Sequence, residues 1–575
     1  MRAIAEVRGI TRKENTSVLR IGIMLNSFNC QSWVAKILTE IQNSSFARIV
    51  LIIRNASMPI QQKKGLQQRL KGYWTHGLFN WYQNWDRKRH KLNLDSFSSV
   101  NVTDVLKDVP VMSVAPVQKG FVDRIAPEDC ARIAESNLDV LFRFGFRIIR
   151  GEILSCAEHG VWSFHHGDNR EYRGAPPGFW EIYERNPVTG SILQILTESL
   201  DGGHVIHRSF SATNFDSLYL SLNPMYWKTA EFAVRRLRDL HRHGGQFLQQ
   251  LPEYNEPNSY RKKIYRTPSA PVMLRFLLRG APGRFGRRVR SLIQAERHQW
   301  FIAIRPRTGL RTILNDRKDF QPLLPPRNRF YADPFLIERN GKTYLFFEDF
   351  DFLKNRAAIS YVEIGHDDQI SAPRRILEKD YHLSYPFLFE QSGEVYMIPE
   401  TRERRTIELY RATPFPEKWD LVRVLTSNVS AVDATLFQRH GKIWLLTNIA
   451  VPGSSTHDEL HLFFAGSLEE EFQPHPNNPV VSDVRRARPA GALFFEEGKL
   501  IRPSQDCSLR YGAALVLNEV EVLSETDYRE RPFARIGPDW FSGSICTHTY
   551  NRTDRFEALD GMVIKRPFML RRGQS

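Results

Sequence analysis

The sequence is poor in cysteine. Five cysteines are scattered through 575 residues, and no two of them form a Cys-x-x-Cys pair. An odd number of widely spaced cysteines argues against a disulfide scaffold and against a cysteine-rich zinc site, and it is typical of a reducing compartment. These residues are Cys30, Cys130, Cys156, Cys507 and Cys546.

Long apolar runs are also missing. The first 17 residues, MRAIAEVRGITRKENTS, contain no apolar core of the kind that a secretory signal needs. No stretch of about 18 consecutive apolar residues occurs, which excludes an ordinary membrane-spanning helix. We therefore predict a cytoplasmic protein, one that could at most touch the inner face of a membrane.

Acidic residues are outnumbered by basic ones, and the net charge is +16. The excess is concentrated between Arg261 and Trp300, where eleven Lys and Arg residues accompany a single acid, Glu296. Apolar and basic residues mix in PVMLRFLLRG, so residues 261–290 could lie on an anionic membrane surface. The alternative is a connector packed between domains with its arginines in solvent. Since no nucleic-acid motif occurs, we expect no nucleic-acid partner.

The first half has the pattern of an α/β domain. From Ser17 to Asn55 an apolar strand, an amphipathic helix and a second apolar strand follow one another. Further helix and strand patterns follow a polar insertion between Gln61 and Phe97, and a basic amphipathic helix runs from Trp227 to His243. We predict an N-terminal tail over 1–17, a Rossmann-like α/β domain over 18–245 and a basic connecting segment over 246–296.

The second half changes to short strands and turns. Four similar segments each contain a strand, a glycine turn and a second strand, and their glycines are 52, 48 and 57 residues apart. This period suits four-stranded blades, so 297–570 is predicted to form a five-bladed β-propeller with a tail over 571–575. The fifth blade would join the strand at Gln299 to the strands near Ile545–Ile564; a β-sandwich is the alternative. The turn glycines are Gly341, Gly393, Gly441 and Gly498.

An ordered set of motifs lies between Gly160 and Gly203. It contains Ser163-Phe164-His165, then Tyr172-Arg173-Gly174, then Thr189-Gly190, then Leu200-Asp201-Gly202-Gly203. This set resembles the signature of the folate-dependent formyltransferases, including the 36-residue separation of His165 and Asp201. The resemblance implies transfer of a formyl group from 10-formyltetrahydrofolate to an amine, with His165 and Asp201 as catalytic residues.

Such a reaction needs a proton-handling histidine, a carboxylate that orients it and donors for a developing oxyanion. The family places an asparagine where this chain has Ser163, and Ser offers one donor on a shorter arm. The loop HGDNREYRG is also more charged than the apolar loop of the family. Another acyl or amine reaction, or ligand binding alone, therefore stays open. The residues predicted to contact substrate or cofactor are His166, Asp168, Tyr172, Arg173, Gly174 and Gly202.

Histidines and acids in this region do not have the spacing of metal ligands. The group His166, Asp168, His204 and His207 matches no zinc pattern, so we predict no metal site.

The second half resembles the five-bladed furanosidase-type glycoside hydrolases. It is more similar to the amino-terminal, hydrolase-like part of the plant glucosamine inositolphosphorylceramide transferases. The matching residues are Tyr331-Ala332-Asp333-Pro334, His548-Thr549-Tyr550-Asn551 and Leu559-Asp560-Gly561. The resemblance implies that Asp333 is a general base.

Paired carboxylates around a central funnel would suit glycoside chemistry. Asp333 and Asp433 each stand eight residues before their turn glycine and so occupy equivalent places in two blades. No counterpart of the hydrolases' acidic glutamate is evident, which leaves carbohydrate binding or glycosyl transfer open beside hydrolysis. The acids could also only cap blade turns. The funnel candidates are Asp333, Asp433, Glu348 and Glu400.

Together these patterns predict an enzyme of surface-glycan biosynthesis. The first domain would formylate the amine of an amino-sugar nucleotide or a lipid-linked amino sugar, and the propeller would bind or process the glycan. The alternative is a glycan-processing or glycosyl-transferring enzyme that acts through the propeller, with a non-formylating first domain. Formylation of a tRNA-bound amino acid is disfavoured, because a propeller stands in place of the small tRNA-gripping barrel.

Overall fold

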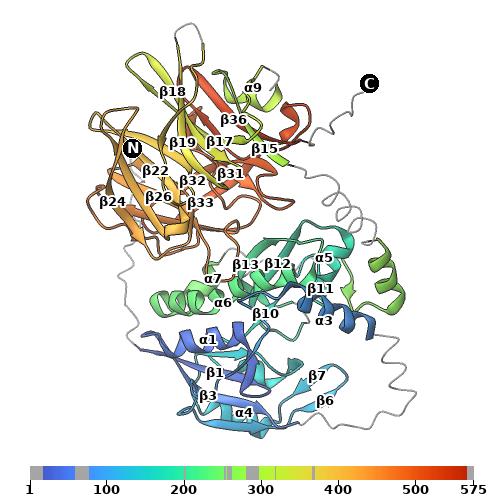
Figure 1. The fold of residues 1–575 in the computed structure, drawn as a ribbon. Coiled ribbons are helices and arrows are strands. Elements are labelled where there is room, and N and C mark those ends of the chain that lie inside the picture. The colour runs from blue at the N-terminus through green and yellow to red at the C-terminus, as the bar shows by residue number, and fades with distance from the viewer. Residues whose placement is uncertain are drawn as a thin grey trace, which may run out of the picture. The chain divides into compact units, whose positions relative to one another are not determined.

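The computed structural model describes residues 17–57, 77–199, 202–251, 254, 262–279, 297–316, 319–365 and 369–565 (Figure 1). The chain forms two compact units. The first comprises Met1–Ser209, Ser217–Phe276 and Pro452–Ser454, and the second comprises Phe210–Asp216, Leu277–Val451 and Ser455–Ser575. Within the described residues, none of the helices combines the length and the apolar character that crossing a membrane requires.

The first unit is built on a seven-stranded sheet with the order β13-β12-β10-β8-β1-β3-β5. Strands β5, β3, β1, β8 and β10 run parallel, and β12 pairs antiparallel with β10. A parallel α/β core was predicted, and the sheet confirms it. The strands are β1 (Leu19–Leu25), β3 (Ala47–Asn55), β5 (Val111–Val114), β8 (Val140–Arg143), β10 (Val161–His165), β12 (Val188–Ile195) and β13 (His204–Ala212).

Helices cover this sheet, and the longest of them is α6 (Leu218–His243). It begins nine residues before the helix predicted at Trp227, because Ser217 caps its amino end by accepting a hydrogen bond from the backbone N–H of Leu220. A short 3₁₀ turn, η2 (Glu152–Ser155), follows β9. The other helices are α1 (Ser32–Gln42), α3 (Leu78–His90), α4 (Pro127–Ala134), α5 (Phe179–Glu184) and α7 (Gln246–Gln250). Short strands are β2 (Asn29–Gln31), β4 (Ser99–Asn101), β6 (Val117–Lys119), β7 (Val122–Arg124), β9 (Ile148–Arg150), β11 (Arg173–Gly174) and β14 (Ile264–Tyr265).

The compact first unit continues beyond residue 245, up to Phe276. Strand β14 pairs in parallel with β11, opposing Gly174 to Tyr265, so part of the predicted connecting segment belongs to this unit. Gly174 has a φ of 91°, and a Cβ atom there would lie 2.2 Å from the Tyr265 carbonyl oxygen. This close approach explains why glycine occupies the position.

Replacing Gly174 by alanine should therefore destabilise the first unit by at least about 2 kcal/mol, since a left-handed backbone strain and a backbone clash add together. Thermal unfolding of the full chain measures the loss. Gly393→Ala is the matched control, because Gly393 has a φ of 80° but nothing within 4 Å of its Cβ position. An equal loss in the two variants would contradict the clash.

The described residues of the second unit form five antiparallel sheets. Four of them take their strands in chain order, and the fifth has the order β16-β15-β36-β34, with β35 also paired to β36. The first two sheets contain β17 (Arg329–Arg339), β18 (Lys342–Asp351), β19 (Arg356–Ile364), β20 (Arg374–Leu377), β21 (Ser384–Gln391), β22 (Glu394–Thr401), β23 (Thr406–Ala412) and β24 (Trp419–Ser427). The third and fourth contain β25 (Ala431–Arg439), β26 (Lys442–Ile449), β27 (Glu459–Ala465), β28 (Gln473–Pro474), β29 (Val481–Ser482), β30 (Phe494–Glu496), β31 (Lys499–Asp506), β32 (Ala514–Leu523) and β33 (Tyr528–Ile536).

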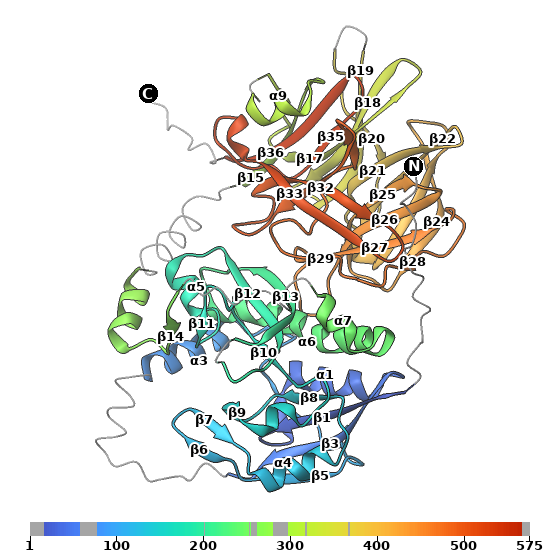
Figure 2. The ribbon, with the colours of Figure 1, turned by 180° about the vertical axis from the view of Figure 1, so that it is seen from behind.

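The fifth sheet joins strands from the two ends of the unit. It contains β15 (Arg297–Pro306), β16 (Gln321–Leu323), β34 (Ser544–Cys546), β35 (Tyr550–Arg552) and β36 (Phe556–Lys565). The strands β15 and β36 lie side by side along their whole lengths (Figure 2). This pairing was predicted for the closing blade, and the five sheets have the strand order of five propeller blades. Pairing between the two ends removes edges that could aggregate. Two short helices, α9 (Leu310–Asn315) and η4 (Pro538–Trp540), flank the sheet.

Each of the four repeated hairpins turns through two residues with positive φ, the geometry that matches the twist of the flanking strands. The four predicted glycines hold the second position, with φ between 70° and 80°. The residues at the first position are Asn340, Ser392, His440 and Glu497.

Candidate functional site

Ser163 lies near the carboxyl end of β10 and is 1% exposed. Its hydroxyl oxygen accepts hydrogen bonds from Nε and Nη2 of Arg143, at 3.1 and 2.9 Å. Arg143 ends the neighbouring strand β8, and its Nη1 donates to the carbonyl of Arg147 at 2.7 Å. The hydroxyl at the Ser163 position is therefore bound to the guanidinium of Arg143, a residue that the sequence motif alone did not reveal.

His165 shares the Ser163 side of the strand, two residues further on. Its Nε2 lies 2.9 Å from the carbonyl oxygen of Tyr172, in the loop that follows β10. Asp201, the predicted catalytic carboxylate, lies outside the described residues, so the structure does not test its pairing with His165. Gly202 is described, and its backbone N–H donates to the carbonyl of Ser199 at 3.1 Å.

His166 and Asp168, which were predicted to contact substrate, both make contacts within the protein. The His166 ring stacks on Tyr226 with centroids 3.7 Å apart, and burial lowers its pKa to about 3. Its Nε2 lies 3.2 Å from the Thr229 hydroxyl oxygen. Asp168 accepts a hydrogen bond from Nη1 of Arg208 at 2.6 Å and fixes the turn that follows.

His166, Tyr172, Arg173 and Gly174 line a common pocket, together with the buried Glu181, but its volume of about 10 Å³ holds no more than one water. Burial raises the pKa of Glu181 to about 8. The Tyr172 hydroxyl donates to Glu184 at 3.2 Å. The pocket of about 10 Å³ is too small for a folate.

A larger cavity of about 250 Å³ opens at the carboxyl ends of β1 and β8. Ligands of open α/β sheets bind at such a position, where neighbouring strands connect to opposite sides. None of the predicted site residues lines it. Its lining comprises Leu25, Asn26, Ser27, Asn29, Cys30, Gln31, Trp33, Val34, Phe97, Ser99 and Phe144.

In the second unit, the first strands of three sheets carry the same backbone irregularity. The pairing register shifts at Asp333, Tyr385 and Asp433, and these residues have φ values of 53°, 44° and 54°. Left-handed backbone is strained for a non-glycine residue and tends to occur at functional sites. The equivalence of Asp333 and Asp433, inferred from their distance to the turn glycines, therefore extends to their conformation.

Asp333 belongs to a buried polar group that connects three sheets. Its Oδ2 accepts from the backbone N–H of Tyr385 at 3.1 Å, and its Oδ1 accepts from the Thr549 hydroxyl at 2.8 Å. His548 lies between two carboxylates, with Nε2 3.5 Å from Asp333 and Nδ1 2.5 Å from Asp560. The ring of His548 also stacks on Trp300 at 4.1 Å.

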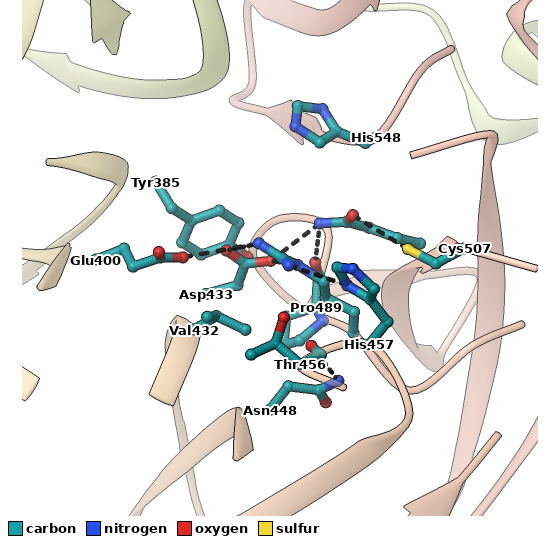
Figure 3. Close-up of polar contacts among 12 residues, drawn as sticks. Tyr385, Glu400, Val432, Asp433, Asn448, Thr456, His457, Pro489, Cys507 and His548 are labelled. Carbon is teal, nitrogen blue, oxygen red and sulfur yellow. Dashed lines mark hydrogen bonds and ion pairs between the residues drawn. The ribbon is translucent and has the colours of Figure 1, made fainter. Parts of the chain in front are cut away.

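Asp433 forms the other half of this polar centre (Figure 3). Arg488 approaches it with Nε at 2.6 Å and Nη2 at 3.2 Å, and Gln505 donates to it at 2.9 Å. Arg488 also lies 3.7 Å from Glu400 and donates through Nη1 to His457 Nδ1 at 3.1 Å. Burial lowers the pKa of His457 to about 4, so its ring is neutral at pH 7 and can accept this bond.

Two carboxyl groups of the centre, Asp333 and Glu400, have raised pKa values. Burial raises the pKa of Asp333 to about 7, although the charge of His548 acts in the opposite direction. Burial and the neighbouring Asp433 raise the pKa of Glu400 to about 8, against the effect of Arg488. Burial alone would lower the pKa of His548, but Asp560 and Asp333 raise it to about 9. A proton acceptor and a proton donor can therefore coexist here near pH 7.5.

Glu348, the fourth predicted acid, pairs with His382 at 3.2 Å. Burial opposes protonation of His382, but the hydrogen bond from this ring to Glu348 raises its pKa to about 9. Glu348 also raises the pKa of Asp333 through its charge. It thus contributes to the electrostatics of the centre while being bound to a histidine.

Asp333, His548 and Asp560 are close enough together to hold a metal ion. However, both carboxylates are already hydrogen-bonded. Asp560 accepts from the backbone N–H groups of Asp333, His548 and Thr549. A cation would have to displace these donors. Hydrogen bonding therefore explains why the three side chains lie close together.

Several residues of the polar centre were not predicted as site residues: Arg488, His457, Gln505, His548 and Asp560. His548 and Asp560 stand in quoted motifs, but nothing in the sequence indicated that they pair. Arg488 begins the fourth repeat and stands two residues before the position that is equivalent to Asp333. This place in the repeat was the only feature of the sequence that could have indicated Arg488 as a site residue.

Comparisons with known proteins match the two units differently. A family model described as "Glucosamine inositolphosphorylceramide transferase 1, N-terminal" matches residues 324–536. Glucosamine inositolphosphorylceramide transferase 1 of Arabidopsis thaliana is 34% identical over 207 residues, which are 35% of this chain and 27% of that relative. The chain thus spans about a quarter of the length of this relative. Methionyl-tRNA formyltransferase of Prochlorococcus marinus is 23% identical over 158 residues, 27% of this chain and 46% of that protein.

Among solved structures, a family 117 glycoside hydrolase of Zobellia galactanivorans is similar at 12% identity, with a TM-score of 0.30, and covers 46% of this chain and 90% of that one. The two sequence relatives are transferases by name, which supports the transferase class.

Proposed function

We propose that the chain processes a glycan, forming or breaking a glycosidic bond at the polar centre of the second unit. The relatives that match residues 324–536 are named for glucosamine and inositolphosphorylceramide. This supports an amino sugar as one substrate and an inositol-phosphate lipid, or a glycan linked to one, as the other. The matched region is the amino-terminal part of the proteins in that family. That this chain shares the activity of the whole relatives is therefore part of our proposal.

One observation carries the proposal: ionisable side chains from three sheets and from two loops meet at one centre. Asp333, Glu400 and Asp433 lie on strands of the first, second and third sheets, Arg488 lies in the loop before β30 of the fourth sheet, and His548 lies in the loop between β34 and β35 of the fifth. Turn-capping acids would instead lie at the periphery, each within its own sheet. Glycosyl chemistry needs an acid for the leaving oxygen and a base for the attacking hydroxyl. Glu400, protonated at neutral pH, suits the first role, and Asp333 suits the second.

The test uses purified full-length protein, nucleotide-activated amino sugars as donors, and inositol-phosphate lipids or their soluble head groups as acceptors. Product formation is followed by mass spectrometry, and binding by saturation-transfer NMR. Glu400→Gln should lower turnover by about a hundredfold, because an amide cannot donate the proton.

Glu390→Gln is the matched control, since Glu390 is exposed at the far end of the same sheet. The proposal fails if no glycan in the panel is bound or converted, or if the two variants behave alike.

Formyl transfer by the first unit is a second candidate. The observation that favours it is the placement of Ser163 and His165 on one side of β10, beside the guanidinium of Arg143. That cation could stabilise an oxyanion in place of the missing amide. 10-Formyltetrahydrofolate with amino-sugar nucleotides should then yield a formamide product, and His165→Ala should abolish it while sparing glycan turnover. Absence of both the product and folate binding would reject this candidate.

A further inference from the structure

Helix α3 has one side fixed to the first unit. Phe79, Tyr82 and Asp86 lie on this inner side and are at most 4% exposed. Asp86 accepts hydrogen bonds from the Ser217 hydroxyl at 2.9 Å and from the backbone N–H of Tyr219 at 2.8 Å, at the amino end of α6. These contacts determine which side of α3 faces outward.

The outer side presents two tryptophans one helical turn apart. Trp81 and Trp85 are 55% and 39% exposed, and their rings stack with centroids 6.2 Å apart and planes at 14°. The guanidinium of Arg89 lies 5.2 Å from the Trp85 ring centroid, and Lys88 is exposed beside it. Two exposed, adjoining indoles are a large apolar area for a protein surface in water.

A neighbouring helical segment, residues 270–279, adds to this surface. Its Phe276 packs edge-on against Tyr82 of α3, with ring centroids 5.3 Å apart. Its Leu274 is 55% exposed, and Arg275 next to it is exposed as well. Both helices therefore combine outward apolar side chains with basic ones. We call Trp81, Trp85, Lys88, Arg89, Leu274 and Arg275 the α3 surface.

We propose that the α3 surface binds an anionic lipid bilayer. Tryptophan prefers the boundary between head groups and acyl chains, where its ring is buried and its N–H stays hydrated. Lys and Arg at the same level attract anionic head groups. The basic and leucine-rich sequence of residues 261–290 left such a contact open beside a packed connector, and residues 261 and 280–290 lie outside the described residues. The structure adds the aromatic residues, which come from a helix almost two hundred positions earlier in the chain.

The experiment is co-sedimentation of the full-length protein with vesicles. Vesicles of phosphatidylcholine alone are compared with vesicles that also contain phosphatidylglycerol. We expect binding to the anionic vesicles that weakens with salt, and a blue shift of tryptophan emission on binding. Trp81→Ala with Trp85→Ala should lower the partition coefficient at least about tenfold. Lys88→Gln with Arg89→Gln should lower it about twentyfold on anionic vesicles and leave the neutral ones unaffected.

Leu353→Ala is the matched control, because Leu353 is an apolar side chain of the second unit that is 84% exposed. The variant Trp81→Phe with Trp85→Phe keeps the apolar surface and should retain most of the vesicle binding. This result separates the loss of the apolar rings in the double alanine variant from a loss of folding. Unchanged partition of the double alanine variant would overturn the proposal. Binding of an RNA oligonucleotide without binding of anionic vesicles would also overturn it.

Discussion

Asp333→Asn is expected to lower glycan turnover about a thousandfold without unfolding the second unit. The loss follows from removing the group that accepts the proton, which contributes up to about 10⁴ in rate. Asparagine is the suitable replacement because it tolerates left-handed backbone, and Asp333 has a φ of 53°. Its amide oxygen can still accept from Tyr385 or Thr549, as the carboxylate does.

The same variant should change how stability depends on pH. The pKa of Asp333 is raised from the model-compound value of 3.8 to about 7, so the folded state holds this proton more tightly than the unfolded state. The contribution of Asp333 to stability is therefore present below pH 3.8 and is lost as the pH rises to about 7. Asp333→Asn should thus unfold at a higher temperature than the natural protein at pH 8, and at nearly the same temperature at pH 4.

A pH profile separates the two proton-handling roles. kcat/KM should rise through pH 7 as Asp333, with its pKa of about 7, loses its proton, and fall through pH 8 as Glu400, with its pKa of about 8, loses its own. Asp333→Asn should remove the acidic limb, and Glu400→Gln the alkaline limb. Turnover of Asp333→Asn within threefold of the natural protein would refute the assignment of the base.

Local sequence patterns predicted the repeated hairpins well, because a two-residue turn with positive φ strongly favours glycine at its second position. Gly341, Gly393, Gly441 and Gly498 all occupy that position. Counting back from these glycines also placed Asp333 and Asp433 at equivalent, irregular points of their strands. The geometry of a hairpin depends on residues that are neighbours in sequence. A single sequence is therefore enough to predict where the hairpins turn.

The composition of the polar centre could not be predicted in the same way. Arg488 lies 55 residues from Asp433, and His548 lies 215 residues from Asp333, yet each pair is in contact. Such pairs depend on how the sheets are placed, which no local pattern encodes. In the first unit, His165 and His166 look alike in sequence, but the ring of His166 is buried against Tyr226, a residue of α6 sixty positions later in the chain.

Glu557→Ala is expected to destabilise the second unit by about 3–5 kcal/mol, because it leaves a buried arginine without its partner. Glu557 of β36 and Arg305 of β15 have side chains that are 2% and 1% exposed, and Nε of Arg305 lies 2.6 Å from the carboxylate. The same carboxylate accepts from the hydroxyls of Thr308 and Tyr550. The pair bridges the two strands that join the ends of the unit.

For a unit of this size, the loss corresponds to a fall of about 10 °C in the midpoint of its thermal transition. Arg305→Met combined with Glu557→Leu should lose less than Glu557→Ala alone, since neither charge is then buried unpaired. Asp554→Ala is the matched control, because Asp554 pairs with Arg307 while 94% exposed and should change stability by less than about 1 kcal/mol. Calorimetry of the three variants decides the matter. Equal losses in Glu557→Ala and Asp554→Ala would show that the β15–β36 closure does not depend on the buried pair.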